Sequence, residues 1–439
     1  MALGGGTFLS QNKVLPGSYI NFSSVQKASA LLSNRGYTAM PLMLDWGPDD
    51  TVITVTSGDF QKNSLKIFGH SYGDKEMLPL RELFEGTQTL YAYRLNGGGV
   101  KATNKYCDAK YSGIAGNKLS TVIAKNVDNE SLFDVETLFD NMVVDCQTVS
   151  KSEELKPNDY VTFKTAALAP TAKTPLTSGT NGSPVTSQSY QKFLDKIESY
   201  SFNALGCPTD DSATIKLFIN FTKRMRNEVG AKFQTVIYNE SSQGKLSDDE
   251  GIIEVANKVT GLNPYGLIYW VTGISAGCPV NKSNTNKRYN GELIVNVDYT
   301  QAQLTKAITE GRLIFHNVNG DIRILDDINS LTTVSDTKGD VFKSNQTIRV
   351  CDQIANDIAT VFNSRYLGTV PNDEDGRMAL WNDICKLILE LAKQRAIENF
   401  NPDDVVILQG DTKKSVVCNI KSLSPVNAMA QLYMSVIIM

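Results

Sequence analysis

The residues best spaced for covalent chemistry form the pentapeptide GISAG, from Gly273 to Gly277. It fits the G-x-S-x-G nucleophile elbow of serine hydrolases, in which the central serine, here Ser275, attacks a carbonyl carbon. Asp298 and His316 follow in the chain order that such hydrolases use. One reading of this sequence is therefore a serine hydrolase of α/β fold that uses Ser275 and His316.

The residues after the pentapeptide argue against this reading. A nucleophile elbow leads directly into a helix, whereas Cys278, Pro279 and the polar run NKSNTNKRYNG follow here. A proline is favoured in the first turn of a helix. We therefore expect a helix that begins at Pro264 and ends near Gly277, with Ser275 as a small packing residue.

Other candidates for chemistry are weak. We expect His316 to be a sheet residue in the strand LIFHNV, and His70, in IFGHSYGD, to lie in a surface turn. With two histidines in the chain, a histidine-rich metal site is excluded. The glycines from Gly97 to Gly99 resemble a phosphate loop but lack its Lys-Ser/Thr ending, so we expect a flexible hinge.

Acidic and sulfur-bearing residues also give no ligand set. The run from Asp373 to Asp375 lacks the spacing of a calcium loop, and acidic residues are expected before a helix. The seven cysteines are widely spread, and the closest two, Cys385 and Cys418, are 33 positions apart. Most of them fit small buried residues of a protein made in a reducing cytoplasm. We expect no catalytic residue, no cofactor and no metal.

Composition describes an ordinary globular protein of two to four domains. The 439 residues are 41% hydrophobic and 21% charged, with a formal net charge of −4. This mild charge gives no basic surface for nucleic acid. We expect no secretory signal at the N-terminus and no membrane insertion.

Changes in composition and hydrophobic pattern along the chain predict its domain organisation. The start is a glycine-rich arm, compact β and α signals follow, and short strands with hairpin spacing fill residues 102–165. A Thr/Ser/Pro-rich stretch, 166–186, predicts an irregular linker. Alternating strands and helices from 187 to 334 favour a central, largely parallel sheet. Beyond residue 335, two long amphipathic helices, 345–366 and 375–398, and several strands indicate a small α+β domain.

The chain ends on NAMAQLYMSVIIM, from Asn427 to Met439. Its apolar residues alternate as in a half-buried strand, with Leu432, Met434, Val436 and Ile438 on one face. The segment is too short to cross a bilayer, which takes about 20 apolar residues in a helix. It therefore needs a sheet to pair with.

Several phrases, in their order, resemble the tail sheath proteins of contractile phages and phage-derived particles, including defective prophages and R-type bacteriocins. They are PGSYINF, PLMLDWGPDDTV, LFEGTQTLYAYRL, YSGIAGNKLS, TSGTNGSPVTSQSYQKFLDKIESYSFNALGCP, EGRLIFHNVNGDIRILDDINSLTT and the closing strand. The resemblance runs over nearly the whole chain. The order of these sequence segments along the chain makes the resemblance specific.

The resemblance implies a multidomain α/β and α+β protein. Its core would be similar to subtilisin without the catalytic triad, with an inserted β-sandwich domain and a C-terminal α+β domain bearing terminal strand arms. The expected parts are an N-terminal arm (1–24), the first part of the core (25–101), the β-sandwich and linker (102–186), the subtilisin-like α/β domain (187–334), a tube-proximal domain (335–426) and a C-terminal arm (427–439).

The family also implies how copies would join. Both arms would be donated to neighbouring subunits as strands, an addition in which main-chain hydrogen bonds give affinity. Tyr19, Ile20 and Phe22 have the matching alternation near the N-terminus. One of the long C-terminal helices would face the tube, and Lys386, Lys393 and Arg395 are its candidate contacts.

The function implied is a structural subunit that polymerises helically around an inner tube and contracts to drive the tube through a cell envelope. Expected partners are further copies in stacked six-subunit rings, the inner tail tube protein, and baseplate and tail terminator proteins. The particle would be a virion tail or phage-tail-like particle assembled in the host bacterial cytoplasm. Besides a hydrolase, the alternative is a binding or capsid-like module that forms closed rings only.

Overall fold

A seven-stranded sheet organises the core of this computed structural model, which describes residues 33–240 and 244–438. Its strands, in spatial order, are β16 (Arg312–Leu313), β13 (Ile252–Val255), β12 (Gln234–Tyr238), β11 (Ala204–Gly206), β1 (Tyr37–Leu42), β3 (Thr89–Arg94) and β2 (Val52–Thr56). Neighbouring strands are parallel except at the edge, where β2 runs antiparallel to β3. The predicted largely parallel sheet is confirmed.

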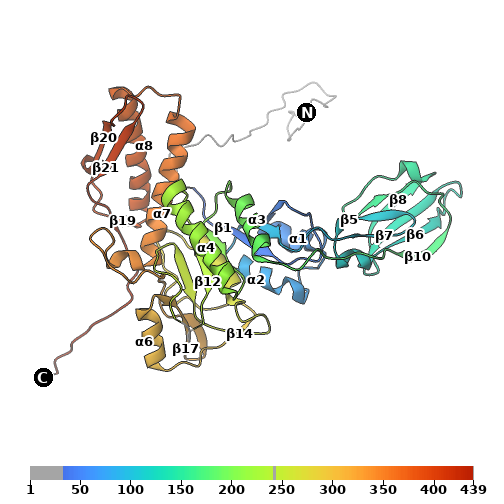
Figure 1. Cartoon of the computed structure of the whole chain (residues 1–439), viewed down its shortest axis with the longest axis horizontal. Coiled ribbons are helices and arrows are strands. Elements are labelled where there is room, and N and C mark those ends of the chain that lie inside the picture. The colour runs from blue at the N-terminus through green and yellow to red at the C-terminus, as the bar shows by residue number, and fades with distance from the viewer. Residues whose placement is uncertain (1–32, 241–243, 439) are drawn as a thin grey trace, which may run out of the picture.

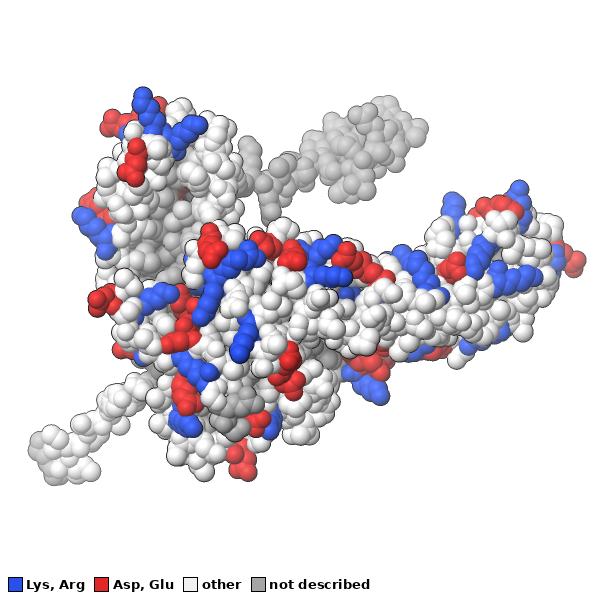
Figure 2. All heavy atoms as spheres, in the orientation of Figure 1, with Lys and Arg blue, Asp and Glu red and all other residues white. Residues whose placement is uncertain are grey.

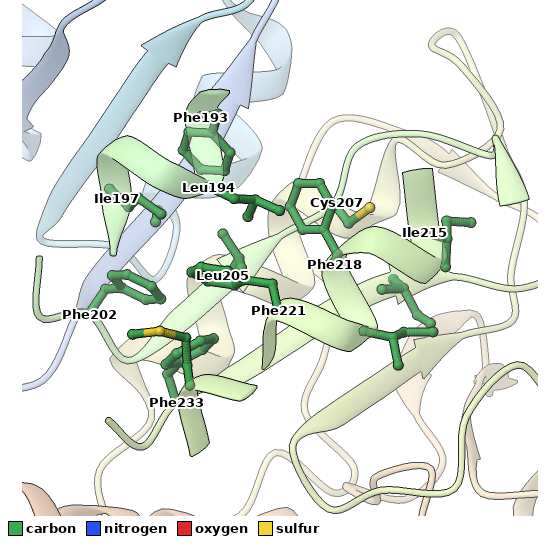
Figure 3. Close-up of a cluster of buried hydrophobic side chains, with 14 of the residues drawn as sticks. Phe193, Leu194, Ile197, Phe202, Leu205, Cys207, Ile215, Phe218, Phe221 and Phe233 are labelled. Atoms are coloured by element: carbon green, nitrogen blue, oxygen red, sulfur yellow. The ribbon is translucent and has the colours of Figure 1, made fainter. Parts of the chain in front are cut away.

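Helices cover both faces of this sheet, so its strands are apolar on both sides. Successive residues show this: Ala39 of β1 packs with the helices of one face and Met40 with those of the other. One face carries α3 (Ser187–Ile197) and α4 (Ser212–Arg224), whose aromatic rings fill the cluster in Figure 3. The other face carries α1 (Ser57–Phe68), α2 (Leu78–Phe84) and α5 (Leu267–Gly277).

Smaller elements complete this part of the chain. Helix α6 (Gln301–Thr309) packs on Ile314, and β17 (Phe315–Val318) turns at Asn319-Gly320 into β18 (Asp321–Ile324). Both turn residues have positive φ, 52° and 92°, as a tight Asn-Gly hairpin turn requires. A short pair, β14 (Val259–Thr260) with β15 (Ile294–Val295), lies nearby.

A β-sandwich projects from the core to the right in Figure 1. One sheet is β10 (Thr171–Pro175), β6 (Leu119–Lys125), β7 (Phe133–Phe139) and β8 (Met142–Val149). The other is β4 (Lys101–Thr103), β5 (Cys107–Ser112) and β9 (Val161–Phe163). The linker prediction for 166–186 is partly wrong, because Thr174 and Pro175 of β10 pair with β6. The Thr- and Pro-rich composition concealed an edge strand.

Two long helices and two small sheets form the C-terminal part. Helix α7 (Asn345–Val361) continues through one π turn to Tyr366, and α8 (Glu374–Lys393) packs against it. The sheets are β20 (Val405–Gln409) with β21 (Val416–Ile420), and β19 (Ile397–Glu398) with β22 (Ser424–Pro425). The second helix therefore ends at Lys393 and not at residue 398, because the chain enters β19 at Ile397.

The surface carries charges of both signs side by side on the face in Figure 2, without a region of one sign. None of the helices in the described residues has the length and apolar character needed to span a bilayer.

Candidate functional site: the C-terminal segment and its anchor

The pentapeptide GISAG is a helix-packing contact in this fold. Ser275 lies in the last turn of α5 and is 4% exposed. A Cβ atom on Gly273 would lie 2.0 Å from the Leu83 carbonyl oxygen of α2, and one on Gly277 would lie 2.0 Å from that of Gly86. The predicted end of the helix is confirmed, whereas its start is Leu267 and not Pro264. The glycines permit backbone contact between helices, and no elbow forms.

The structure corrects the prediction for His70, which is 6% exposed and not in a surface turn. Its Nε2 lies 3.5 Å from the Asp45 carboxylate, and the hydrogen bond from His70 lowers the pKa of Asp45. His316 lies in strand β17, as predicted. It is opposite Arg323, and partial burial lowers the pKa of the imidazole. No three metal-ligating side chains come together within the described parts of the chain.

The glycines from Gly97 to Gly99 lie in the neck, the pair of closely packed chain crossings that joins the core to the β-sandwich. They do not form the flexible hinge that we expect from the sequence. A Cβ atom on Gly99 would lie 1.9 Å from the Thr180 carbonyl oxygen of the returning chain. Gly182 N donates to Asn96 O at 2.9 Å, so the two crossings to the β-sandwich run side by side. Glycine is needed here for close approach of two backbones.

The C-terminal segment leaves the body of the molecule as an extended chain (Figure 1). Leu432 is 86% exposed, Val436 70% and Ile438 91%. Residues 427–438 form no strand with any described part of their own chain. Such a run of apolar side chains and free backbone groups invites pairing with another sheet.

The root of this segment is fixed to α7. Gln346 Nε2 donates to Val426 O at 2.9 Å, and Ala428 N donates to Gln346 Oε1 at 2.9 Å. The Asn427 side-chain oxygen accepts from Ser344 and Thr347 at 3.3 Å. Sequence reasoning missed Gln346, because its partners are about 80 positions away and no local pattern singles it out.

The hairpin β20–β21 offers edges for such a strand. It is a two-stranded sheet in the described chain, so the outer backbone groups of both strands have no sheet neighbour. One face, with Val405 and Ile407, packs into the cluster with α8. The other carries Leu408 opposite Val417, and both are exposed.

The predicted cations lie at the surface of α8 and just beyond it. Lys386 and Lys393 are exposed, and Lys393 Nζ lies 3.4 Å from Glu390. Arg395 is exposed and has φ 61°, a left-handed conformation that usually falls to glycine. Tyr19, Ile20 and Phe22 lie outside the described residues.

Four family models match this chain in succession. They are the domain III N-terminal region of the tail sheath protein Gp18 (residues 35–95), the phage tail sheath β-sandwich domain (97–181), the phage tail sheath central domain (183–330) and the phage tail sheath C-terminal domain (337–439).

Curated relatives match over the full length. The chain is 31% identical over 478 aligned residues to the uncharacterised protein YqbK of Bacillus subtilis (strain 168), covering 99% of each. It is equally similar to XkdK of the phage-like element PBSX of that strain. The tail sheath protein of Clostridium phage phiCD119 is 28% identical over 214 residues, 48% of this chain and 58% of that protein.

Solved structures agree in fold. The sheath tail protein of Desulfitobacterium hafniense matches with a TM-score of 0.76 and 35% identity over 90% of this chain and 93% of that one. That of Listeria innocua matches with a TM-score of 0.79 and 29% identity, over 90% and 92%. The contracted helical sheath of the anti-feeding prophage, at 12% identity and a TM-score of 0.55, shares the fold over 97% of this chain and 99% of its own.

Proposed function

This chain belongs to the family of phage tail sheath proteins and is a structural subunit of a contractile sheath, not an enzyme; from that premise we propose how its copies are joined. The C-terminal arm, 427–439, is donated as a β-strand to a neighbouring copy. The N-terminal arm, with Tyr19, Ile20 and Phe22, is donated in the same way. A strand given to a neighbour in one direction makes a head-to-tail contact, which builds an open helical polymer when the rotation between copies does not close into a ring.

One observation carries this proposal: the chain ends on an apolar strand pattern that its own fold leaves bare. Burying Leu432, Met434, Val436 and Ile438 would contribute roughly 1.5–3 kcal/mol each, before the cost of ordering the segment. A segment that belonged to its own core would lie buried in the single chain, and these side chains are exposed.

The acceptor we propose is the hairpin β20–β21. An isolated two-stranded sheet is marginal, and added strands stabilise it. Its outer face carries exposed Leu408 and Val417, which arm residues of alternate positions could cover. The central sheet is a poorer acceptor at one end, because its edge strand β16 is two residues long.

The domains then take different tasks. In this proposal residues 25–101 and 187–334 form the subtilisin-like core, and residues 102–186 form the outward sandwich and its linker. Residues 335–426 lie near the inner tube, which Lys386, Lys393 and Arg395 contact. The single neck at Asn96 and Gly182 supports an outward sandwich, because the rest of the molecule does not enclose it.

The particle is a phage tail or phage-tail-like particle assembled in the host cytoplasm. Stacked six-subunit rings surround the inner tail tube protein, and baseplate and tail terminator proteins close the two ends. Contraction drives the tube through a cell envelope. No cofactor is required, because the energy is stored in the packing of subunits.

Electron microscopy of the purified full chain, with and without residues 429–439, tests the proposal. Full-length protein should form tubes, and the truncated protein should be a folded monomer by circular dichroism and gel filtration. Val127→Asp, at an exposed valine of the sandwich, is the control and should form normal tubes. Tubes from the truncated protein, or its unfolding as a monomer, would refute arm donation.

A further inference from the structure

Segments at both ends of the described fold are bonded to one helix, α7. The C-terminal arm leaves beside Gln346, and Ser33, the first described residue after the N-terminal arm, is bonded to Gln353. Seven residues are two helical turns, so Gln346 and Gln353 lie on the same side of α7, about 10 Å apart along its axis. Two segments from opposite ends of the sequence therefore start from neighbouring points.

The anchor of the C-terminal arm copies the contact of a strand. Gln346, 2% exposed, donates to Val426 O and accepts from Ala428 N, both at 2.9 Å. These are the two backbone groups that flank Asn427, and a neighbouring strand would satisfy them in the same way. The side-chain amide thus holds the last fixed residue in extended conformation before the free part begins.

The contact nearest the N-terminal arm is a second polar cluster, in which Gln353 and Asp357 are buried and Ser33 is exposed. Gln353 Nε2 donates to Ser33 Oγ at 2.8 Å and to Asp357 Oδ2 at 2.7 Å, and Ser33 Oγ donates to Asp357 Oδ1 at 2.5 Å. Two residues on, Arg35 donates to the carbonyl oxygens of Ser275 and Cys278 at the end of α5.

Between and beside the anchors, α7 is bonded to the core by charged and amide groups. Arg349 lies 2.7 Å from Asp327, and Asp352 lies 2.6 Å from Arg226; all four side chains are nearly buried. Asn345 Nδ2 donates to Asp327 Oδ1 at 2.9 Å. Breaking a buried ion pair by removing one partner is costly, so α7 resists displacement from the core.

We propose that α7 carries tension directly from one arm to the other. A pull on the C-terminal arm passes through Gln346 and Asn427 into α7, and leaves through Gln353 and Asp357 to Ser33. The donated arms are then connected through one helix in each subunit, and the ion pairs of α7 with Asp327 and Arg226 hold that helix in place under load. This inference rests on the proposed donation of the arms.

The test uses tubes of the full chain exposed to graded shear, with tube length measured by negative-stain microscopy. Gln346→Leu and Gln353→Leu should each assemble but break into pieces several-fold shorter than wild type. Because the anchors act in series, the double variant should break like the weaker single one, within about twofold. Effects that multiply would mean independent anchors and would overturn the proposal.

One control variant and one further anchor variant make the result specific. Gln191→Leu, on an exposed face of α3, should leave tube length unchanged. Asn427→Ala removes the acceptor of Ser344 and Thr347 at an exposed position, so it should weaken tubes without affecting folding. If tubes of Gln346→Leu and of Asn427→Ala break to the same length as wild-type tubes, the role of α7 is refuted. If the truncation at 429 still forms tubes, it is arm donation that fails.

Discussion

The backbone of Gly273 lies against the carbonyl oxygen of Leu83, so closely that a Cβ atom on Gly273 would lie 2.0 Å from that oxygen. A second contact is also too close for a side chain, since a Cβ atom on Gly86 would lie 2.4 Å from the Gly273 carbonyl. Helices α2 and α5 therefore touch backbone to backbone. The glycine spacing that suggests a nucleophile elbow is a requirement of this packing.

Gly273→Ala should destabilise the protein, because the added methyl group must push the two helices apart. Overpacking of this kind costs typically about 1–3 kcal/mol. Urea unfolding followed by circular dichroism should show a lower midpoint. Ser275→Ala should change the midpoint little and leave tube formation intact. A folded Ser275→Ala protein that lost assembly or particle function would contradict the assignment of Ser275 as a packing residue.

Local signals predicted most elements of this fold. The hairpin turn at Asn319-Gly320, and the end at Gly230 (φ 91°) of the helical turn that follows α4, are marked by residues that tolerate positive φ. The helix ending at Gly277 follows from apolar residues ahead of a polar run. Strand β10 was missed because Thr171–Pro175 lies at a sheet edge, where proline and polar residues are tolerated.

Contacts between distant residues could not be predicted in the same way. His70 is buried beside Asp45, a residue 25 positions earlier, although its local sequence resembles an exposed turn. Gln346 reads as a polar residue of a helix, and its role depends on Val426, 80 positions away. The alternating apolar pattern of the C-terminal segment is local, so the sequence alone shows it, and its pairing as a strand stays a prediction.

The ion pair between Asp327 and Arg349 should make the protein acid-sensitive. Burial alone would raise the pKa of Asp327, but Arg349 holds it below its usual value. A carboxyl group with a depressed folded pKa stabilises the fold above its unfolded pKa of about 3.9 and loses that contribution as pH falls below it. Urea midpoints should therefore drop between about pH 5 and pH 2.

Asp327→Asn separates this effect from general acid denaturation. At pH 7 the variant should lose roughly 3–5 kcal/mol, because Arg349 is left buried without its partner. The gap between wild type and variant should shrink in acid. The exposed Asp336→Asn serves as control and should keep the wild-type profile. A gap that stayed constant down to pH 3 would show that this pair is not the acid-sensitive group.

Arg395 permits a test of tube contact in which one substitution should raise the stability of the protein and weaken its binding to the tube. Its left-handed backbone suits glycine, and an L-residue there costs about 1 kcal/mol. Arg395→Gly should thus raise the unfolding midpoint, and it also removes an exposed cation. If the cation contacts the tube, sheath–tube co-sedimentation should weaken, as it should for Lys386→Glu. Unchanged co-sedimentation in both variants would mean that these cations simply face water.

Deletion of the β-sandwich should leave a protein that still forms tubes. Asn96 and Gly182 are hydrogen-bonded neighbours, so a short glycine-serine link can replace residues 97–181. The deletion uncovers Trp46, which packs on Tyr111, and takes Ser112 O from Arg94, so the unfolding midpoint should fall. Tubes should appear narrower by negative stain. A folded variant that remained monomeric would show that the sandwich makes core contacts.

The two faces of the C-terminal arm provide the sharpest matched pair. Val436 and Ser435 are adjacent, and in an added strand their side chains point to opposite faces. Val436→Asp should place a charge on the apolar face of the added strand, whereas Ser435→Asp places it on the opposite, polar face. We expect tubes to be lost or shortened at least tenfold for Val436→Asp and nearly unchanged for Ser435→Asp. Both monomers should unfold at the wild-type midpoint, because the arm lies outside the core of its own chain.

Cross-linking tests the acceptor, since cysteine at Val436 should form an intermolecular disulfide with cysteine at Leu408 or Val417. Equal assembly defects in the two aspartate variants would mean that the arm does not bind as a strand.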